Sequence, residues 1–419
     1  MTLLKSTFSF LLDLRVRLRA HLMRRLICDF NNGYFGNAWM ELFLENNKLF
    51  TKKQLLFSTV QTFSHRHFTS DSLLEKKFLE QNFNFKKYKI IPDEIENTNF
   101  KILLLTPRDY RGYPNQVFQD FSRHLDDTGR QYTWIDVQSD AAAAEFSQEL
   151  RRVTPQSKIL LFVEPLATPE VFPQEWSSLK DLITKARQSH QNLRVVSWLG
   201  DIWREKDFVA STAFSEDADL FIHMDNLAIS RFPNSFQNKS WFFPFASFDQ
   251  GIFAPSTKNQ NVFFSGQIRD SDRRFWIRLA SKQLRRTDIN FELNVWEKWT
   301  LGGLNLNDYA NRLNTSFACL SLTQRGKEHW IIPARAIQAL QSGCLLIQQE
   351  GVGKSPLSEF LNPGKHYLPF TNPIELNAIF QLIQNDPNLA LNIALDGSNR
   401  IRELFTNSYF WRKCSNLFN

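Results

Sequence analysis

Two short segments of the sequence carry residue types that suit the binding of a phosphorylated ligand. In the first, Gly266 directly follows an apolar run that predicts a strand, and a helix is predicted a few residues later. A glycine turn before a helix presents backbone N–H groups to an anion, and the helix dipole adds to the attraction. Arg269, or the neighbouring Arg273 or Arg274, would supply a charge-assisted contact. Taken alone, an ordinary strand-to-helix turn with solvated arginines explains this segment better.

The second segment is a predicted helix at residues 333–342, which ends at Gly343. Arg335 and Gln338 are three positions apart, so they share one face near the amino end of this helix. One of them would contact a phosphate and the other a ribose hydroxyl. Gly343 suits the position that terminates a helix. A solvated face of an ordinary helix gives the same pattern, so the pattern by itself is weak evidence for a site.

The elements that would position these residues form a regular series from Lys101 onward. Short apolar strands alternate with helices, which is typical of parallel sheets covered on both faces. A stretch at residues 241–255 has two prolines and no helical period, and it predicts a crossing between two domains. The expected strands are 101–106, 132–137, 158–163, 193–199, 218–224, 262–265, 289–295, 317–322 and 344–348; the expected helices are 116–125, 141–153, 174–189, 272–284, 333–342 and 373–385.

This series predicts an α/β fold with two doubly wound, Rossmann-like domains that face a cleft. In such sheets ligands bind beyond the carboxyl ends of the strands. We expect residues 1–98 to be a basic, mostly helical region in front of the two domains, which would span 99–245 and 246–385. Residues 386–419 would form C-terminal helices.

In their order along the chain, the segments resemble the donor domain of group 1 glycosyltransferases with the GT-B fold. They are most similar to the CgeB/YkvP-like branch of that family. The resemblance covers roughly residues 99–412 and depends on the ordered set, because no single motif is highly specific. The set consists of a crossing at 243–253, the strand and glycine at 263–266, the segments 308–313 and 316–322, the Arg335–Gly343 motif, the Pro363-Gly-Lys365 turn, the strand and helix at 366–370 and 374–383, and an arginine-rich tail at 400–412.

The sequence departs from the family pattern at two places. Gln338 stands where the family usually has a glutamate that bonds the donor ribose, and Ala246 and Ser247 stand where a glycine is usual. Glutamine accepts and donates hydrogen bonds but carries no charge. These departures leave a degenerate, non-catalytic member of the fold open as an alternative.

The resemblance implies that residues 246–385 bind a nucleotide-sugar donor. Its diphosphate would lie near Gly266, Arg269 and Arg335, with Gln338 and Gly343 also in the donor-binding set. The positive groups would stabilise the departing nucleoside diphosphate in place of a metal ion. We therefore expect no cofactor and no essential divalent metal.

The resemblance also implies that residues 99–245 bind the acceptor. Among polar residues that follow the predicted strands of this domain, Asp201 or Asp109 would deprotonate an acceptor hydroxyl. Tyr110 or Trp203 would stack on a sugar face. Each has a plainer explanation, since Asp201 would also cap the next helix and Trp203 would also pack in a core. His223, at the end of the strand 218–224, is better explained as a satisfied residue beside the core than as a base.

The function predicted on these grounds is that of a hexosyltransferase-type glycosyltransferase. It would move a sugar from a nucleotide-sugar donor to a glycan or lipid-linked acceptor in cell-envelope or surface-polysaccharide synthesis. Two alternatives are kept: a non-catalytic nucleotide- or carbohydrate-binding protein with the same fold, and a sugar-nucleotide epimerase. A glycosidase has little support, because no paired carboxylates are evident.

Composition excludes several other classes. The four cysteines are scattered and show no metal-binding spacing, so a disulfide scaffold or structural zinc site is not expected. The net charge is +7, and residues 1–98 carry 15 Lys and Arg against 10 Asp and Glu. A nucleic-acid-binding protein more often spreads its basic residues over the folded domain, so no nucleic-acid partner is expected.

The first 30 residues combine a leucine stripe at helical spacing with five arginines, from Arg15 to Arg25. The favoured interpretation is a helix that packs on the next domain, and the alternative is peripheral contact with an anionic membrane. The sequence has no run of 18 or more apolar residues and no signal-peptide pattern. We expect a cytoplasmic protein, with the inner face of the membrane as the place of any peripheral contact.

Overall fold

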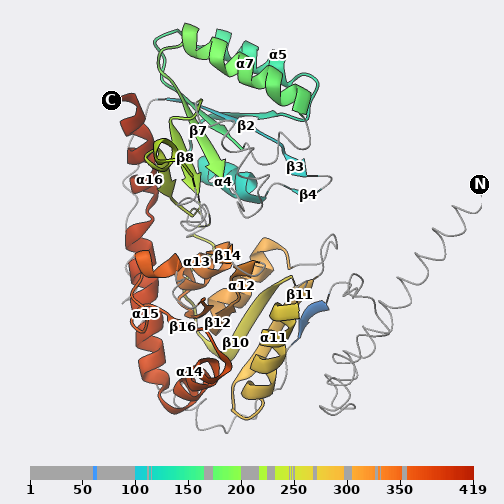
Figure 1. Cartoon of the computed structure of the whole chain (residues 1–419), viewed down its shortest axis with the longest axis vertical. Helices are drawn as coiled ribbons and strands as arrows, with labels where there is room; N and C mark the ends of the chain where they lie inside the picture. The colour runs from blue at the N-terminus through green and yellow to red at the C-terminus, as the bar shows by residue number, and fades with distance from the viewer. Residues whose placement is uncertain are drawn as a thin grey trace, which may run out of the picture. The chain divides into compact units, whose positions relative to one another are not determined.

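The computed structural model describes the chain in segments, whose helices and strands are labelled in Figure 1. For the short strands β1, β3, β4, β13 and β14 it describes the backbone only. The described residues are 60–63, 100–110, 113–114, 116–164, 173–199, 217–223, 232–244, 246, 248, 251–267, 271–296, 304–325, 329–330, 332–351 and 356–419. They contain two six-stranded sheets with helices packed on them, so the predicted α/β class is confirmed.

The first sheet has the strand order β5-β2-β6-β7-β8-β9, and all its strands are parallel. Its strands are β2 (Lys101–Thr106), β5 (Tyr132–Asp136), β6 (Ile159–Val163), β7 (Leu193–Leu199), β8 (Leu220–His223) and β9 (Ser240–Phe242). Every residue of β6 is buried, as expected for a central parallel strand covered on both faces. The predicted crossing at 241–255 was partly wrong, because its first two residues belong to β9 at the edge of this sheet.

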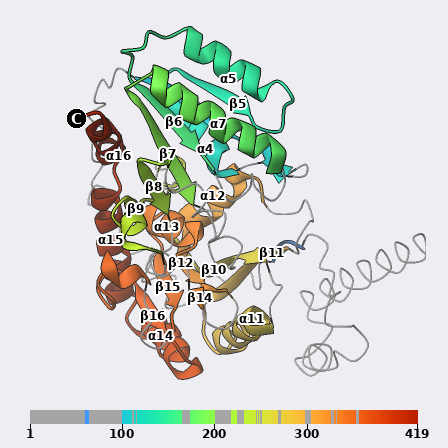
Figure 2. The ribbon, with the colours of Figure 1, turned by 45° about the horizontal axis from the view of Figure 1, so that its top comes forward.

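Helices cover both faces of the first sheet (Figure 2). The helices are α4 (Gln116–Asp127), α5 (Ala142–Arg151), α7 (Pro173–Ser189) and the short α10 (Asn234–Gln237). Phe146 of α5 and Ile183 of α7 pack with Leu103, Leu161 and Val195 in one core. On the other face, the ring of Phe121 of α4 lies against the ring of Phe162 of β6, with centroids 4.8 Å apart.

The second sheet has the order β1-β11-β10-β12-β15-β16. Its strands are β1 (Val60–Phe63), β10 (Asn259–Gln267), β11 (Asn290–Trp296), β12 (Ser316–Ser321), β15 (Leu345–Gln349) and β16 (Leu368–Phe370). The helices between and after these strands are α11 (Ser271–Leu284), α12 (Leu306–Thr315), α13 (Ala334–Gln341) and α14 (Pro373–Asn385). Strand β1 runs antiparallel to β11. It is the one described part of the region 1–98, for which a mostly helical structure was predicted; the rest of that region, including residues 1–30, lies outside the described residues.

Two small hairpins lie outside the sheets and were not predicted from the sequence. Strand β3 (Asp109–Tyr110) pairs with β4 (Tyr113–Pro114), and β13 (Gln324–Arg325) pairs with β14 (His329–Trp330). Each follows closely on a strand of a six-stranded sheet, β2 in the first case and β12 in the second. Two-residue strands are too short for a periodic pattern to indicate them.

The C-terminal helices α15 (Pro387–Leu404) and α16 (Asn407–Ser415) complete the chain, and α16 packs on the first sheet. The ring of Phe410 lies among the rings of Phe121, Phe162 and Phe248, with centroids 4.8 to 6.2 Å away. Trp411 belongs to the same aromatic cluster, with its ring centroid 5.0 Å from that of Phe410 and 6.1 Å from that of Phe121. The predicted C-terminal helices therefore exist, and the second of them is part of the first sheet's core.

Trp411 is held between a cation and a neutral histidine. The guanidinium carbon of Arg130 lies 4.1 Å from the centroid of the Trp411 ring. The indole Nε1 of Trp411 donates a hydrogen bond of 3.3 Å to Nε2 of His124. Burial, together with the charge of Arg130, lowers the pKa of His124 to about 3. His124 is therefore neutral at neutral pH, with Nε2 available to accept this bond.

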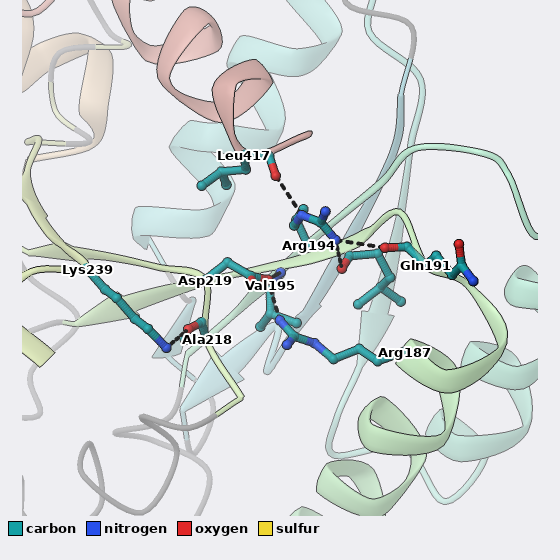
Figure 3. A network of polar contacts seen from close by, with 9 residues as sticks. Arg187, Gln191, Arg194, Val195, Ala218, Asp219, Lys239 and Leu417 are labelled. Carbon is teal, nitrogen blue, oxygen red and sulfur yellow. Dashed lines mark hydrogen bonds and ion pairs between the residues drawn. The ribbon is translucent and has the colours of Figure 1, made fainter. Parts of the chain in front are cut away.

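The last residues of the chain are fixed at the amino end of β7, as Figure 3 shows. Nε of Arg194 donates to the carbonyl oxygen of Leu417 at 2.6 Å, and its guanidinium lies 5.6 Å from the Phe418 ring. Next to this contact, Asp219 accepts a hydrogen bond from the backbone N–H of Val195 at 2.7 Å and pairs with Arg187. The C-terminal segment is thus anchored by both polar and ring contacts.

A buried polar network ties the three central strands of the second sheet together. Nδ2 of Asn261 donates to Oε2 of Glu292 at 2.8 Å and to Oγ of Ser316 at 3.2 Å, so it links β10 to both neighbours. Arg312 of α12 pairs with Glu292 at 2.7 Å. Burial raises the pKa of Glu292, and the Arg312 charge and the hydrogen bonds oppose that rise without cancelling it.

Among the helices of the described residues, none has the length and hydropathy of a membrane-spanning segment.

The raised pKa of Glu292 predicts a pH dependence of stability. A raised pKa in the folded state stabilises the protein below the ordinary glutamate pKa, and this contribution is lost as the pH rises through the folded value. Glu292→Gln removes the titration and keeps the shape, so the Tm of the wild type should fall relative to that of the variant as the pH rises from about 4, near the ordinary glutamate pKa, through the raised folded-state value. Thermal unfolding of both proteins across that range is the measurement.

The matched control is Arg312→Met, which removes the opposing cation from the same carboxylate. It should make the loss of stability with rising pH steeper than in the wild type. A wild-type Tm that stays constant or rises relative to that of Glu292→Gln as the pH increases would contradict the assignment.

Candidate functional site

Gly266 lies inside strand β10 rather than in the turn after it. Its backbone is in register with Val295 of β11, and the pairing continues to Gln267 and Trp296. The sequence predicted that the strand ends at Ser265, which was two residues too early, because the neighbouring strand extends the hydrogen-bonded ladder. Oγ of Ser265 accepts a hydrogen bond of 3.1 Å from Nδ2 of Asn294, which fixes the backbone next to Gly266. Residues 268–270, including Arg269, lie outside the described residues.

The two alternatives to Arg269 are on α11 and differ in exposure. Arg273 is buried with 5% of its surface exposed, and Arg274 is half-buried. A buried guanidinium is costly to desolvate and is normally fixed by hydrogen bonds within the protein. Of these two, Arg274 is the better suited to reach a ligand.

Arg335 and Gln338 lie on α13 as predicted, on the same face of the helix. The guanidinium NH2 of Arg335 points toward the backbone that leaves β12, 3.4 Å from the carbonyl oxygen of Leu322. Gln338 is buried with 8% of its surface exposed. Arg335 is half-buried, and its Nε is buried. The contact with Leu322 places its guanidinium where the chain leaves β12.

Gly343 ends α13 through a Schellman motif. Its φ is 70°, its N–H donates to the carbonyl of Leu340 at 3.0 Å, and the N–H of Cys344 donates to the carbonyl of Ala339 at 2.9 Å. This is the pattern in which a left-handed glycine closes a helix and satisfies its last carbonyls. The described contacts give Gly343 this backbone role, and its place in a donor-binding set stays a prediction.

The acceptor-side candidates are only partly described. The backbones of Asp109 and Tyr110 form β3, directly after β2, where they pair with Pro114 and Tyr113. This places both residues beyond the carboxyl end of a central strand of the first sheet, as the sequence predicted. Asp201 and Trp203 lie outside the described residues.

His223, at the carboxyl end of β8, is not satisfied in the way that the sequence suggested. It is 4% exposed, and burial lowers its pKa to about 3, so it is neutral at neutral pH. Its Nδ1 is buried and has no hydrogen-bond partner among the described residues. A buried, unsatisfied polar atom is uncommon and calls for a ligand, a water or a proton-transfer role. Only the side-chain environment reveals this, since the surrounding sequence reads as an ordinary core strand.

Residues 269–414 match the family model described as glycosyl transferase-like, and this range contains α11 to α13, β15 and most of α16. No curated protein matches the sequence.

Among solved structures, the chain is similar to a glycosyltransferase from Rickettsia africae ESF-5. The TM-score is 0.50 and the identity 10%, with 77% of this chain and 98% of that chain covered. It is also similar to Anabaena HepE in complex with UDP, with a TM-score of 0.49 and 12% identity over 76% of this chain and 100% of that chain. The two sheets, built mainly of parallel strands and covered by helices, together with the similarity to the Rickettsia africae structure, confirm the expected GT-B type of fold.

The Schellman motif yields a test of the local structure that positions Arg335 and Gln338. Gly343→Ala forces a Cβ into the left-handed region, which costs about 1–2 kcal/mol per residue. Thermal unfolding should show a lower Tm for this variant with the fold retained. Gly251→Ala is the control, because a Cβ at Gly251 meets no atom within 4 Å and the residue does not have a left-handed φ. Equal Tm values for the two variants would be evidence against the motif.

Proposed function

We propose that this protein is a glycosyltransferase that moves a sugar from a nucleotide-sugar donor to a carbohydrate or lipid-linked acceptor. The observation that carries the proposal is the match of residues 269–414 to the glycosyl transferase-like model, because that range contains α13 with Arg335 and Gln338. The fold supports it, since a protein of the same fold from Rickettsia africae is described as a glycosyltransferase. A cell-envelope or surface polysaccharide as the acceptor, and the CgeB/YkvP-like branch, remain expectations from the sequence.

In this proposal an acceptor hydroxyl attacks the anomeric carbon of the donor sugar while the bond to the diphosphate breaks. Arg335 stabilises the negative charge that develops on the departing diphosphate, which is the electrostatic contribution that usually dominates such transfers. Gln338 accepts or donates a hydrogen bond to a ribose hydroxyl. Asp109 or Asp201 takes the proton of the acceptor hydroxyl. We expect the reaction to proceed without an essential divalent metal.

The role of Arg335 can be tested with a nucleotide screen followed by a transfer assay. A ligand that binds only the folded state raises the Tm. We expect one of UDP, GDP, CMP, ADP or dTDP to raise the Tm of the wild type, and the shift to persist in EDTA. Arg335→Ala should abolish most of this shift and reduce transfer about 10²- to 10³-fold, as expected for loss of a group that stabilises transition-state charge.

The matched control is Arg400→Ala, an arginine of α15 whose side chain is 43% exposed and pairs loosely with Glu403. It should leave the nucleotide shift and the turnover unchanged. Turnover of Arg335→Ala equal to that of the wild type would remove Arg335 from the donor site. Nucleotide binding without transfer would favour the non-catalytic alternative, and conversion of the donor without an acceptor would favour an epimerase.

The departure at Gln338 supports that non-catalytic alternative, because the family resemblance places a glutamate there. Gln338→Glu restores the charge at a buried position beside Arg335. If the protein is an active transferase adapted to glutamine, the variant should bind nucleotide no more than a few-fold more tightly. A gain of transfer activity from an inactive wild type would instead show that glutamine had disabled the site.

A further inference from the structure

Arg402 of α15 joins two parts of the chain that lie far from it in sequence. The residue is 9% exposed. One terminal nitrogen of its guanidinium donates to the carbonyl oxygen of Phe253 at 2.9 Å and to the carbonyl oxygen of Gln341 at 2.6 Å. Phe253 belongs to the segment that leads into β10, and Gln341 is the last residue of α13. A single buried cation therefore connects the helix α15 with that segment and with the end of α13.

The carbonyl of Gln341 is the one at the end of α13 that the Schellman motif does not satisfy. The carbonyls of Gln338, Ala339 and Leu340 accept from the N–H groups of residues 342, 344 and 343, respectively. The last four carbonyls of a helix need partners outside the helix, and its carboxyl end attracts positive charge. Arg402 supplies the missing partner and places its charge where the helix dipole favours it.

A second contact fixes α15 against the same end of α13. Gly397 packs so closely that an added Cβ would lie 2.1 Å from the carbonyl oxygen of His366 and 2.9 Å from Cδ2 of Leu340. No other residue type fits this spacing without a shift of the backbone. Leu340 and Gln341 are neighbours, so α15 contacts α13 through packing and through hydrogen bonds at one place.

We propose that Arg402 is a positioning residue for α13. Because α13 has only eight residues, its length is about 12 Å, and a tilt at its carboxyl end moves its amino half. That half carries Arg335, which is assigned to the donor, and Gln338 follows one turn later. Arg402 does not touch the donor in this proposal; it sets the direction from which Arg335 and Gln338 meet it. The inference rests on the proposed function for its effect on the donor, and on the contacts alone for its effect on α13.

The test compares Arg402→Met, Arg402→Lys and the control Arg400→Met on the same helix. Hydrogen exchange is measured on the apo proteins for residues 334–344 and 251–256, with residues 116–127 of α4 as the internal reference. Arg402→Met should raise exchange in the first two segments about tenfold, as expected for loss of hydrogen bonds to a charged group, and leave α4 unchanged. Arg402→Lys retains a cation with fewer fixed donors and should fall between Met and wild type. Arg400→Met should match the wild type.

The functional arm measures KM for the donor and kcat with the nucleotide sugar found by the screen. Arg402→Met should raise KM about tenfold and lower kcat less, because the binding groups are misplaced but present. If residues 334–344 of Arg402→Met exchange hydrogen at the same rate as in the wild type, the inference is wrong. A uniform rise of exchange in α4 and α13 in both Arg402 variants would also overturn it, because the role would then be merely structural. If Arg402→Met does not fold, the comparison of Arg402→Lys with wild type decides by the same readouts.

The two proposals fail in different ways. A wild-type protein that binds none of the nucleotides contradicts the proposed function, while the exchange arm still decides the role of Arg402. A wild-type protein that binds nucleotide, with α13 unaffected in Arg402→Met, contradicts the positioning role alone.

Discussion

Parallel strands have to be covered on both faces, and the first sheet meets this requirement with parts of the chain that are far apart. Helices α5 and α7, which lie between its own strands, cover one face. The other face is shared by α4 and by α16 near the end of the chain, where Trp411 bonds to His124 across 287 positions of sequence. A fully buried strand such as β6 would otherwise expose Phe162 to water. The hydrophobic requirement of one sheet therefore fixes where the last helix has to go.

Buried polar groups supply the specificity that apolar packing lacks. Apolar side chains tolerate small shifts of register, whereas Asn261 satisfies its hydrogen bonds only when β10 lies between Glu292 and Ser316. Arg402 acts similarly between helices, because its two acceptors are backbone carbonyls whose positions depend on the fold and not on side-chain identity. Two buried histidines differ from Arg402 because they carry no charge at neutral pH. His124 and His223 are kept neutral by burial, which avoids a charge in the core.

Much of the sheet architecture was predictable from the sequence. Continuous apolar runs such as 101–106 and 158–163 indicate buried parallel strands directly, and the helices between them follow from their periodicity. The end of β10 was predicted too early, because only the partner strand determines how far a ladder extends past Ser265. Strand β9 was missed, since three residues beside a proline carry no period.

The candidate site was less predictable, for a related reason. The pattern of Arg335, Gln338 and Gly343 identified α13 and its terminating glycine. The resemblance included Arg402 only as a member of the arginine-rich tail, and its hydrogen bonds to the carbonyls of Phe253 and Gln341 are visible only in the fold. The unsatisfied Nδ1 of His223 is likewise a property of its surroundings.

The attachment of α16 also has a consequence for the order in which the protein is made. A ribosome produces α4 and the strands of the first sheet long before it produces α16, and domains generally fold as they emerge. Until Phe410 and Trp411 arrive, the rings of Phe121, Phe162 and Phe248 have no partner from α16. An incomplete chain of this kind exposes an aromatic surface, which is the property that chaperones bind and that drives aggregation of nascent proteins. Once α16 has been made and has packed on the first sheet, this aromatic surface is covered and chaperones are no longer needed to shield it.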